Sequence, residues 1–313
     1  MMETPIEKRI RELRLQGKHP HRPGRYTLAG SARRYGEKQL SQLVQDLFSE
    51  LERILPNPPE RTDAAPSPLR SVRELVRPLT DRFARMASGR VGRILDEAER
   101  EERATSARQL SSLGIDVLGG EPWLKRELET RSKSFTGLIR DVGNSLPKRI
   151  GELALEALEK GWSRPKLKQK LKLEAGVADR KIRLIARDQV GKLQGALHES
   201  RQRDVGITSF VWRTSRDERV AGNPSGLYPD AKSNSPTHGN HWEREGRRFR
   251  WTPSDGGRLI EILPNGKEQV TVFRDGIPGH GIQCRCFAEP FIEGLEDLQE
   301  LDRPSKEARR YRV

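Results

Sequence analysis

The segment Ile207-Thr208-Ser209-Phe210-Val211-Trp212-Arg213-Thr214 marks the point where the sequence changes its periodicity. Before about residue 205, apolar residues recur every three to four positions, as they do in amphipathic helices. From Ile207 onward they alternate with polar residues, which places Phe210 and Trp212 on the same side of a strand. The sequence therefore predicts an α+β protein, with an N-terminal and central helical body and a small antiparallel β-rich C-terminal domain.

Two further strands are expected on either side of a tight turn. Residues 258–262 and 269–273 are apolar or β-branched segments that flank Pro264-Asn265-Gly266, and Asn-Gly is a strong hairpin signal. Residues 215–247 are rich in Gly, Pro, Asn and Ser and are predicted to form a long loop, a feature that is often functional in a small domain. We expect the β-rich domain over residues 204–292 and a charged tail over residues 293–313.

Upstream of these strands, the chain is predicted to divide into four parts. Residues 1–37 are expected to form a flexible basic arm, because Pro and Gly interrupt any helix and apolar periodicity is weak. A short helix over residues 38–56 and a Pro-rich linker over residues 57–68 follow. A helical domain is expected over residues 69–203, with a helix stop at Gly161-Trp162-Ser163.

The chain is strongly basic. Its 313 residues carry a formal net charge of +14, from 59 Lys and Arg against 45 Asp and Glu, and such a surplus attracts DNA, RNA or acidic protein surfaces. An N-terminal arm that neutralises phosphates would gain free energy from counterion release, whereas the alternative is a tail with no partner. The candidate nucleic-acid-binding residues are Arg9, Arg11, Arg14, Lys18, Arg22, Arg25, Arg33 and Arg34.

Composition also argues against several classes of protein. No apolar run approaches the ~18 residues that span a bilayer, so no membrane span is expected. The N-terminal sequence lacks the apolar core of a secretory signal. The only two cysteines are Cys284 and Cys286, which excludes a disulfide framework and fits a reducing cytoplasm.

The most specific local pattern is Pro278-Gly279-His280-Gly281-Ile282-Gln283-Cys284-Arg285-Cys286. Together with His238 and His241 of the long loop, it offers the thiol and imidazole ligands that zinc takes in structural sites. The candidate metal ligands are His238, His280, Cys284 and Cys286, and zinc would hold the loop against the hairpin. The alternative is that the two thiols lie partly buried at the start of a strand, with no cofactor.

The same residues also allow a catalytic interpretation. A cysteine nucleophile would need His280 or His238 within hydrogen-bond reach and an orienting acid such as Asp217. No recognisable catalytic spacing is present, so we assign no catalytic residue and do not expect an enzyme. Aromatic residues interleaved with arginines, as around Trp212 and Trp251, fit either a platform for single-stranded nucleic acid or a small β core. The alternation favours the core.

Residues from about 150 to 290 resemble the phage head morphogenesis family, the Mu F-like minor head proteins. The motifs that carry this resemblance are, in order, Glu159-Lys160-Gly161-Trp162-Ser163, Ile185-Ala186-Arg187-Asp188-Gln189, the segment 212–220, His238 and the segment 278–286. Asp188-Gln189 stands where the family has Thr-Glu, and Gln283 stands where it has Asn. The resemblance covers a little under half of the chain.

The resemblance implies a minor capsid protein, a virion component associated with the portal vertex. It would act in head assembly, DNA packaging or DNA delivery, with the portal protein, other capsid proteins and phage DNA as partners. Its location would be the capsid interior, and the host cytoplasm during assembly. The alternative function is a metal-dependent nuclease or a Cys/His hydrolase in the C-terminal domain.

The same resemblance implies a set of residues that stabilise the C-terminal domain. These residues are Trp212, Asp217, Arg219, His238, Pro278, His280, Cys284, Arg285 and Cys286. Within the set, we expect Asp217 and Arg219 to form an ion pair and Arg285 to donate hydrogen bonds to backbone carbonyls.

Overall fold

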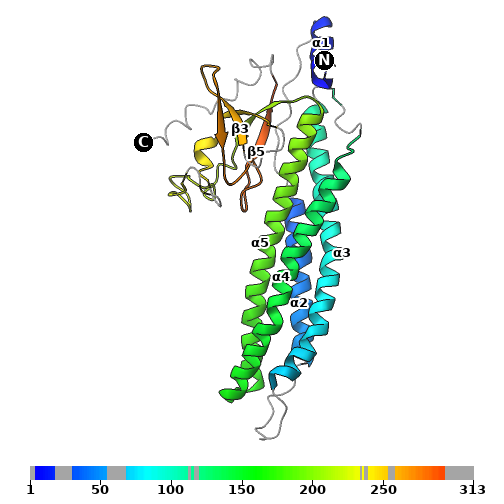
Figure 1. Cartoon of the computed structure of the whole chain (residues 1–313), viewed down its shortest axis with the longest axis vertical. Coiled ribbons are helices and arrows are strands. Elements are labelled where there is room, and N and C mark those ends of the chain that lie inside the picture. Colours follow the sequence, from blue (N-terminus) through cyan, green and yellow to red (C-terminus); the bar gives the residue numbers. More distant parts are fainter. Residues whose placement is uncertain are drawn as a thin grey trace. The chain divides into compact units, whose positions relative to one another are not determined.

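The computed structural model describes residues 4–17, 30–54, 68–111, 114–115, 120–232, 235, 239–252 and 258–292. These residues form five α-helices and a five-stranded antiparallel sheet, which confirms the α+β class (Figure 1). The chain divides into two compact units: unit 1 comprises Met1–Ala29, Glu99–Pro122 and Gln194–Val313, and unit 2 comprises Gly30–Ala98 and Trp123–Leu193. Two helices therefore contribute to both units. The boundary predicted near residue 203 does not coincide with the division between the two units.

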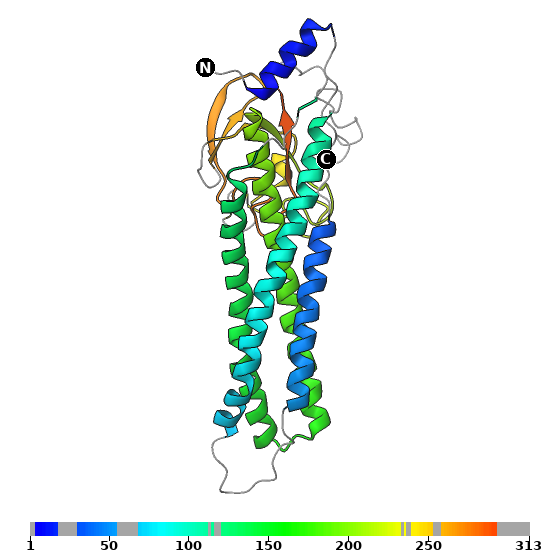
Figure 2. The same ribbon diagram turned by 90° about the vertical axis from the view of Figure 1, so that its right-hand side faces the viewer.

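Unit 2 is helical, and its four segments run side by side in both views (Figures 1 and 2). They belong to α2 (Ser31–Ile54), α3 (Pro68–Ser111), α4 (Leu124–Glu159) and α5 (Arg164–Asp204). A Cβ atom added to Gly36 of α2 would lie 3.1 Å from Ile94 of α3 and 3.7 Å from Ala186 of α5, so three helices approach closely there. No helix in the described ranges contains a stretch long and apolar enough to cross a membrane.

The prediction of helices over residues 69–203 is confirmed. Gly161 adopts the left-handed φ of +59° just after α4 ends, and the backbone N–H of Trp162 donates to the carbonyl of Ala157 at 2.8 Å. This is the helix stop that the Gly-Trp-Ser motif predicts. The helix expected over residues 38–56 begins earlier, at Ser31, because the apolar stripe extends back to Ala32.

The N-terminal residues differ from the predicted flexible arm. Helix α1 (Pro5–Leu15) begins at a capping box, in which the Thr4 hydroxyl accepts from Glu7 N and the Glu7 carboxylate accepts from Thr4 N. Ile6 is buried in a cluster of unit 1 that also contains Leu110, Ile115, Val205, Ile207 and Ile292. Few apolar residues suffice to order this helix, because unit 1 supplies a surface that covers them.

This change leaves the basic residues of the N-terminal region in three settings. On α1, Lys8, Arg11 and Arg14 are exposed, whereas Arg9 is half-buried and pairs with Glu12 at 3.4 Å. Arg33 and Arg34 belong to α2. Three other candidates for nucleic-acid binding, Lys18, Arg22 and Arg25, lie outside the described residues. The same holds for the Pro-rich linker up to residue 67 and for the tail over residues 293–313.

The sheet of unit 1 has the strand order β4-β3-β2-β1-β5. Its strands are β1 (Ser209–Arg213), β2 (Arg248–Arg250), β3 (Arg258–Ile262), β4 (Glu268–Val272) and β5 (Phe287–Phe291). The expected strands at β1, β3 and β4 and the hairpin between the last two are confirmed; Gly266 has the left-handed φ of +79° that its turn requires. Strand β5 begins directly after the two thiols, where one of the alternatives places the start of a strand, whereas no strand is predicted at β2; both pair with β1.

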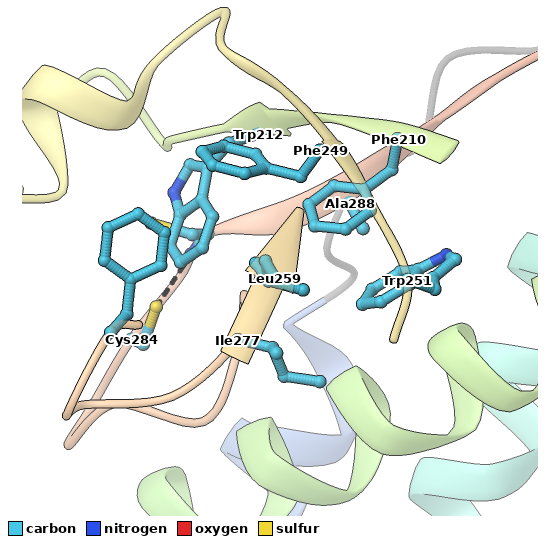
Figure 3. Close-up of a cluster of buried hydrophobic side chains, with 10 residues drawn as sticks. Phe210, Trp212, Phe249, Trp251, Leu259, Ile277, Cys284 and Ala288 are labelled. Carbon is cyan, nitrogen blue, oxygen red and sulfur yellow. Dashed lines mark hydrogen bonds between the residues drawn. The ribbon is translucent and has the colours of Figure 1, made fainter. Parts of the chain in front are cut away.

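The aromatic residues of the sheet form its core. Phe210 and Trp212 are fully buried on one side of β1, as the alternation predicts, and Phe249 of β2 is buried beside them (Figure 3). The rings of Phe210 and Trp251 lie 4.0 Å apart between centroids. These side chains are packed against one another, so they do not form an open platform for single-stranded nucleic acid.

The last turns of α5 carry a buried network of charged side chains within unit 1. Arg201, which is 1% exposed, donates to Glu99 at 2.7 Å and to Glu121 at 2.5 Å, and it also pairs with the buried Glu102. The amide of Gln202 donates to the carbonyl of Ala288 in β5 at 2.8 Å. This network joins the ends of α3 and α5 to the sheet.

Candidate thiol and histidine centre

His241, Cys284 and Cys286 bring one nitrogen and two sulfur atoms together inside unit 1. Nδ1 of His241 lies 3.5 Å from Sγ of Cys284 and 3.3 Å from Sγ of Cys286. The three potential ligand atoms all lie within 4.8 Å of one another. The three residues are 7%, 6% and 4% exposed, so the centre is part of the core rather than of the surface.

The backbone explains how the two cysteines come to face the same imidazole. Cys284 and Cys286 directly precede β5, where alternate residues point to the same side of an extended chain. The turn before them is closed by a hydrogen bond from Cys284 N to the carbonyl of Gly281 at 3.0 Å. Gln283 takes the left-handed φ of +52° within this turn. The backbone N–H of Cys286 then donates to Sγ of Cys284 at 3.3 Å.

His241 arrives from the long loop, just before the short helix η1 (Trp242–Arg244). The backbone N–H of Trp242 donates to the carbonyl of Ala221 at 3.0 Å, which anchors this part of the loop. The ring of Trp212 packs edge-on against the imidazole, with 5.8 Å between centroids. In Figure 3 the Trp212 ring lies above Cys284 at the margin of the aromatic core. The imidazole therefore has an apolar wall on one side and the two thiols on another.

The second nitrogen of His241 is held by Asp275. Nε2 of His241 lies 2.6 Å from Oδ2 of Asp275. The same carboxylate accepts from both terminal nitrogens of Arg244, at 3.1 and 2.9 Å, and from Gly239 N at 3.1 Å. The Arg244 guanidinium lies 3.8 Å from the centroid of the Phe273 ring. The carboxylate thus orients both the imidazole and the guanidinium.

Gly239 is required at its position by this packing. A Cβ atom there would lie 2.0 Å from Nη2 of Arg244 and 2.8 Å from the Asp275 carboxylate. Only a residue without a side chain lets the backbone N–H approach Asp275 this closely.

The proximity of these groups shifts their pKa values. Burial lowers the pKa of His241, but the Cys284 thiolate and the Asp275 carboxylate outweigh it and raise that pKa to about 9. Burial also raises the pKa of Asp275, but hydrogen bonds from His241 and Arg244 bring it down to about 2. A hydrogen bond from Cys286 lowers the pKa of Cys284, while burial and the neighbouring thiolate raise the pKa of Cys286. The centre therefore favours one thiolate beside an imidazolium ion when no metal is bound.

The structure changes the predicted ligand set. Cys284 and Cys286 belong to it as expected, but the histidine that joins them is His241 and not His280, which is absent from the group of converging ligands found among the described residues. His238 lies outside the described residues. Asp275, and not Asp217, is the carboxylate next to the imidazole. Sequence reasoning missed Asp275 and Arg244 because neither belongs to a motif, although Asp275 lies in the turn just before the Pro278–Cys286 segment.

The remaining residues of the predicted structural set have local roles. Asp217 forms its ion pair with Arg285 rather than with Arg219, whose backbone N–H donates to the same carboxylate at 3.0 Å. Through the Asp217 carboxylate, Arg285 therefore joins the long loop to β5, the strand that follows Arg285. The carbonyl of Pro278 lies 2.8 Å from where a Cβ on Gly195 would be, so a glycine in α5 lets this turn approach the helix.

Comparison with known proteins gives one distant relative of unknown function. The chain is 22% identical over 275 residues to an uncharacterized protein of Haemophilus influenzae; the alignment covers 83% of this chain and 53% of that protein. The chain thus spans about half the length of that relative. No protein-family profile and no solved structure matches the chain.

Proposed function

We propose that this chain is a phage minor capsid protein that acts at the portal vertex in head assembly, DNA packaging or DNA delivery. The proposal begins from the resemblance of its ordered motifs to the Mu F-like minor head proteins. Its partners would then be the portal protein, other capsid proteins and phage DNA. Its location would be the virion, and the host cytoplasm during assembly.

One observation favours a structural role over a catalytic one. The two motif segments that carry the resemblance in unit 1 meet through the Asp217–Arg285 ion pair and through the packing of Trp212 near the buried thiols. Cys284 and Cys286 are 6% and 4% exposed, so a substrate cannot approach their sulfur atoms without a rearrangement of the core. Side chains that are buried and paired in this way stabilise a domain more readily than they catalyse a reaction.

The charge of the chain supports DNA as one partner. Lys8, Arg11 and Arg14 lie exposed on one helix, where they can contact successive phosphates of a duplex. Neutralising three phosphates contributes about 2.7 to the slope of log affinity against log salt. We expect the triple change of these residues to Gln to reduce the slope for duplex DNA by that amount.

A matched control places the same loss of charge elsewhere. Lys166, Lys172 and Lys181 are exposed on the part of α5 that belongs to unit 2. Their change to Gln should leave the slope nearly unchanged. An equal reduction of the salt slope in both triple variants would show that α1 makes no specific contribution to DNA binding.

The assembly role is tested in the replicating phage. The gene for this chain is deleted, and particles are examined by electron microscopy and for packaged DNA, with the wild-type gene supplied in trans as the control. We expect a loss of DNA-filled infectious heads that the supplied gene restores, together with co-purification of the chain with the portal protein. Particles of normal number, DNA content and infectivity without the chain would overturn the proposal.

A Cys/His hydrolase is the second candidate, and one observation favours it. Cys284, His241 and Asp275 stand in the series thiol, imidazole, carboxylate that activates a cysteine nucleophile. An active nucleophile would react with iodoacetamide faster than an unfolded-peptide thiol at neutral pH. We expect slow alkylation that accelerates only on unfolding; fast alkylation of Cys284 in the folded chain would favour the hydrolase over the structural role.

A further inference from the structure

We propose that His241, Cys284 and Cys286 form a binding site for a zinc ion, a site that goes beyond the assembly role and does not depend on it. Four features of the described residues support this site: the spacing of the ligand atoms, the orientation of the imidazole, the balance of buried charge, and the elements that the site would join.

The spacing fits a tetrahedral metal. With zinc–sulfur and zinc–nitrogen bonds of about 2.3 and 2.0 Å, a sulfur and a nitrogen ligand of one tetrahedron lie about 3.5 Å apart. Nδ1 of His241 lies 3.5 and 3.3 Å from the two sulfur atoms. Both nitrogen–sulfur distances therefore match those around one zinc ion, and the three ligand atoms all lie within 4.8 Å of one another.

The imidazole is oriented as a ligand. Nε2 of His241 donates to Asp275 at 2.6 Å when the ring is neutral, which leaves the lone pair of Nδ1 directed at the thiols. A carboxylate that accepts from the far nitrogen of a histidine is the usual second layer of a zinc site, where it fixes the ring and increases its basicity. The backbone N–H of Cys286, which donates to Sγ of Cys284 at 3.3 Å, stabilises a bound thiolate in the same way.

The buried charges balance when zinc is present. Two thiolates neutralise one divalent cation, and the Asp275 carboxylate is neutralised by Arg244 through two hydrogen bonds. A neutral cluster avoids the cost of an unpaired charge inside the protein. Thiolate and imidazole ligands select zinc over magnesium or calcium, which prefer oxygen.

The ion would join segments that are far apart in the sequence. His241 lies at the end of the long loop, whereas the cysteines directly precede β5. Among the described residues, three side chains supply ligands to the site. The three ligands are buried, so the protein would shield the ion from solvent on the side of these residues.

The test measures zinc in the full chain, purified with a reducing agent and loaded with zinc chloride. We expect one tightly bound zinc per chain by elemental analysis, and thiolate-to-metal charge-transfer absorption after substitution with Co²⁺. Binding should be lost in Cys284→Ser, Cys286→Ser and His241→Gln and kept in His280→Gln, the matched control in the same turn. Less than one tenth of a zinc per wild-type chain, or equal binding in the three ligand variants, would overturn the proposal.

Two further measurements keep the test decisive if a ligand variant fails to fold. In the wild-type chain, zinc should slow the alkylation of both cysteines at least tenfold; an unchanged rate would refute cysteine ligation. Asp275 is a positioning residue, because it orients His241. Its change to Asn should weaken zinc binding about 10–100-fold without loss of the cobalt–thiolate absorption.

Discussion

Replacement of Arg201 by Leu should destabilise unit 1 more than any change at a charged surface residue. Arg201 is 1% exposed and pairs with Glu99, Glu102 and Glu121, and the side chain of Glu102 is itself fully buried. Removal of the guanidinium leaves the Glu102 carboxylate in the core without its cation. Breaking a buried pair from one side costs about 3–5 kcal/mol in the free energy of unfolding.

The control is Arg203→Leu on the same helix turn. The side chain of Arg203 is 41% exposed, and its ion pair with Glu199 spans 3.3 Å. An exposed pair of this kind is worth about 0–1 kcal/mol. The two variants lose the same charge and receive the same apolar side chain, so their difference reports burial and pairing.

The assay is urea unfolding followed by circular dichroism, with hydrogen exchange of peptides from α5 and β5 to localise the effect. The double variant Glu102→Gln/Arg201→Leu removes the stranded charge and should recover at least about half of the lost stability. If Arg201→Leu lies within about 1 kcal/mol of the control, or if the double variant is no more stable than Arg201→Leu alone, the buried ion pairs do not stabilise unit 1 as predicted.

Two further predictions concern the turn that carries the thiols. The pKa of Asp275 is about 2 in the folded chain, against 3.8 ordinarily. Ionisation of Asp275 therefore stabilises the metal-free protein by about 2 kcal/mol above pH 4, and this stabilisation is lost as the pH falls toward 2. Denaturant titrations over this range should show a shallower pH dependence for Asp275→Asn than for the wild type or for the exposed control Asp230→Asn; equal slopes for all three would contradict the assignment. Gln283 holds a left-handed φ of +52°, which Asn tolerates better, so Gln283→Asn should raise the free energy of unfolding by about 0.5 kcal/mol. The same change at Gln169, inside α5, should slightly lower the free energy of unfolding, because Asn is the poorer helix former. A loss of stability at both positions would show that Gln283→Asn does not release backbone strain.

Features that depend on neighbours along the chain can be predicted from the sequence alone. The alternation around Phe210 and Trp212 identified a strand and its buried side, and Asn265-Gly266 identified the hairpin. The helical periodicity before residue 205 identified α3, α4 and α5, with the stop at Gly161. Each signal is local, because a strand or a helix repeats its pattern over a few residues.

Contacts between residues that are distant in the sequence depend on the folded chain. Pairing of β5 with β1 and anchoring of the long loop bring the thiols of Cys284 and Cys286 to His241, although His280 lies nearer in sequence. Asp275 joins them from a turn that carries no motif. Helix α1 is likewise ordered by a capping box and by apolar residues from three other segments, which no local count of its Pro, Gly and Arg residues can foresee. The physical reason is the same in each case. Burial and charge pairing stabilise contacts between groups that the fold brings together, and separation along the sequence does not give their distance in space.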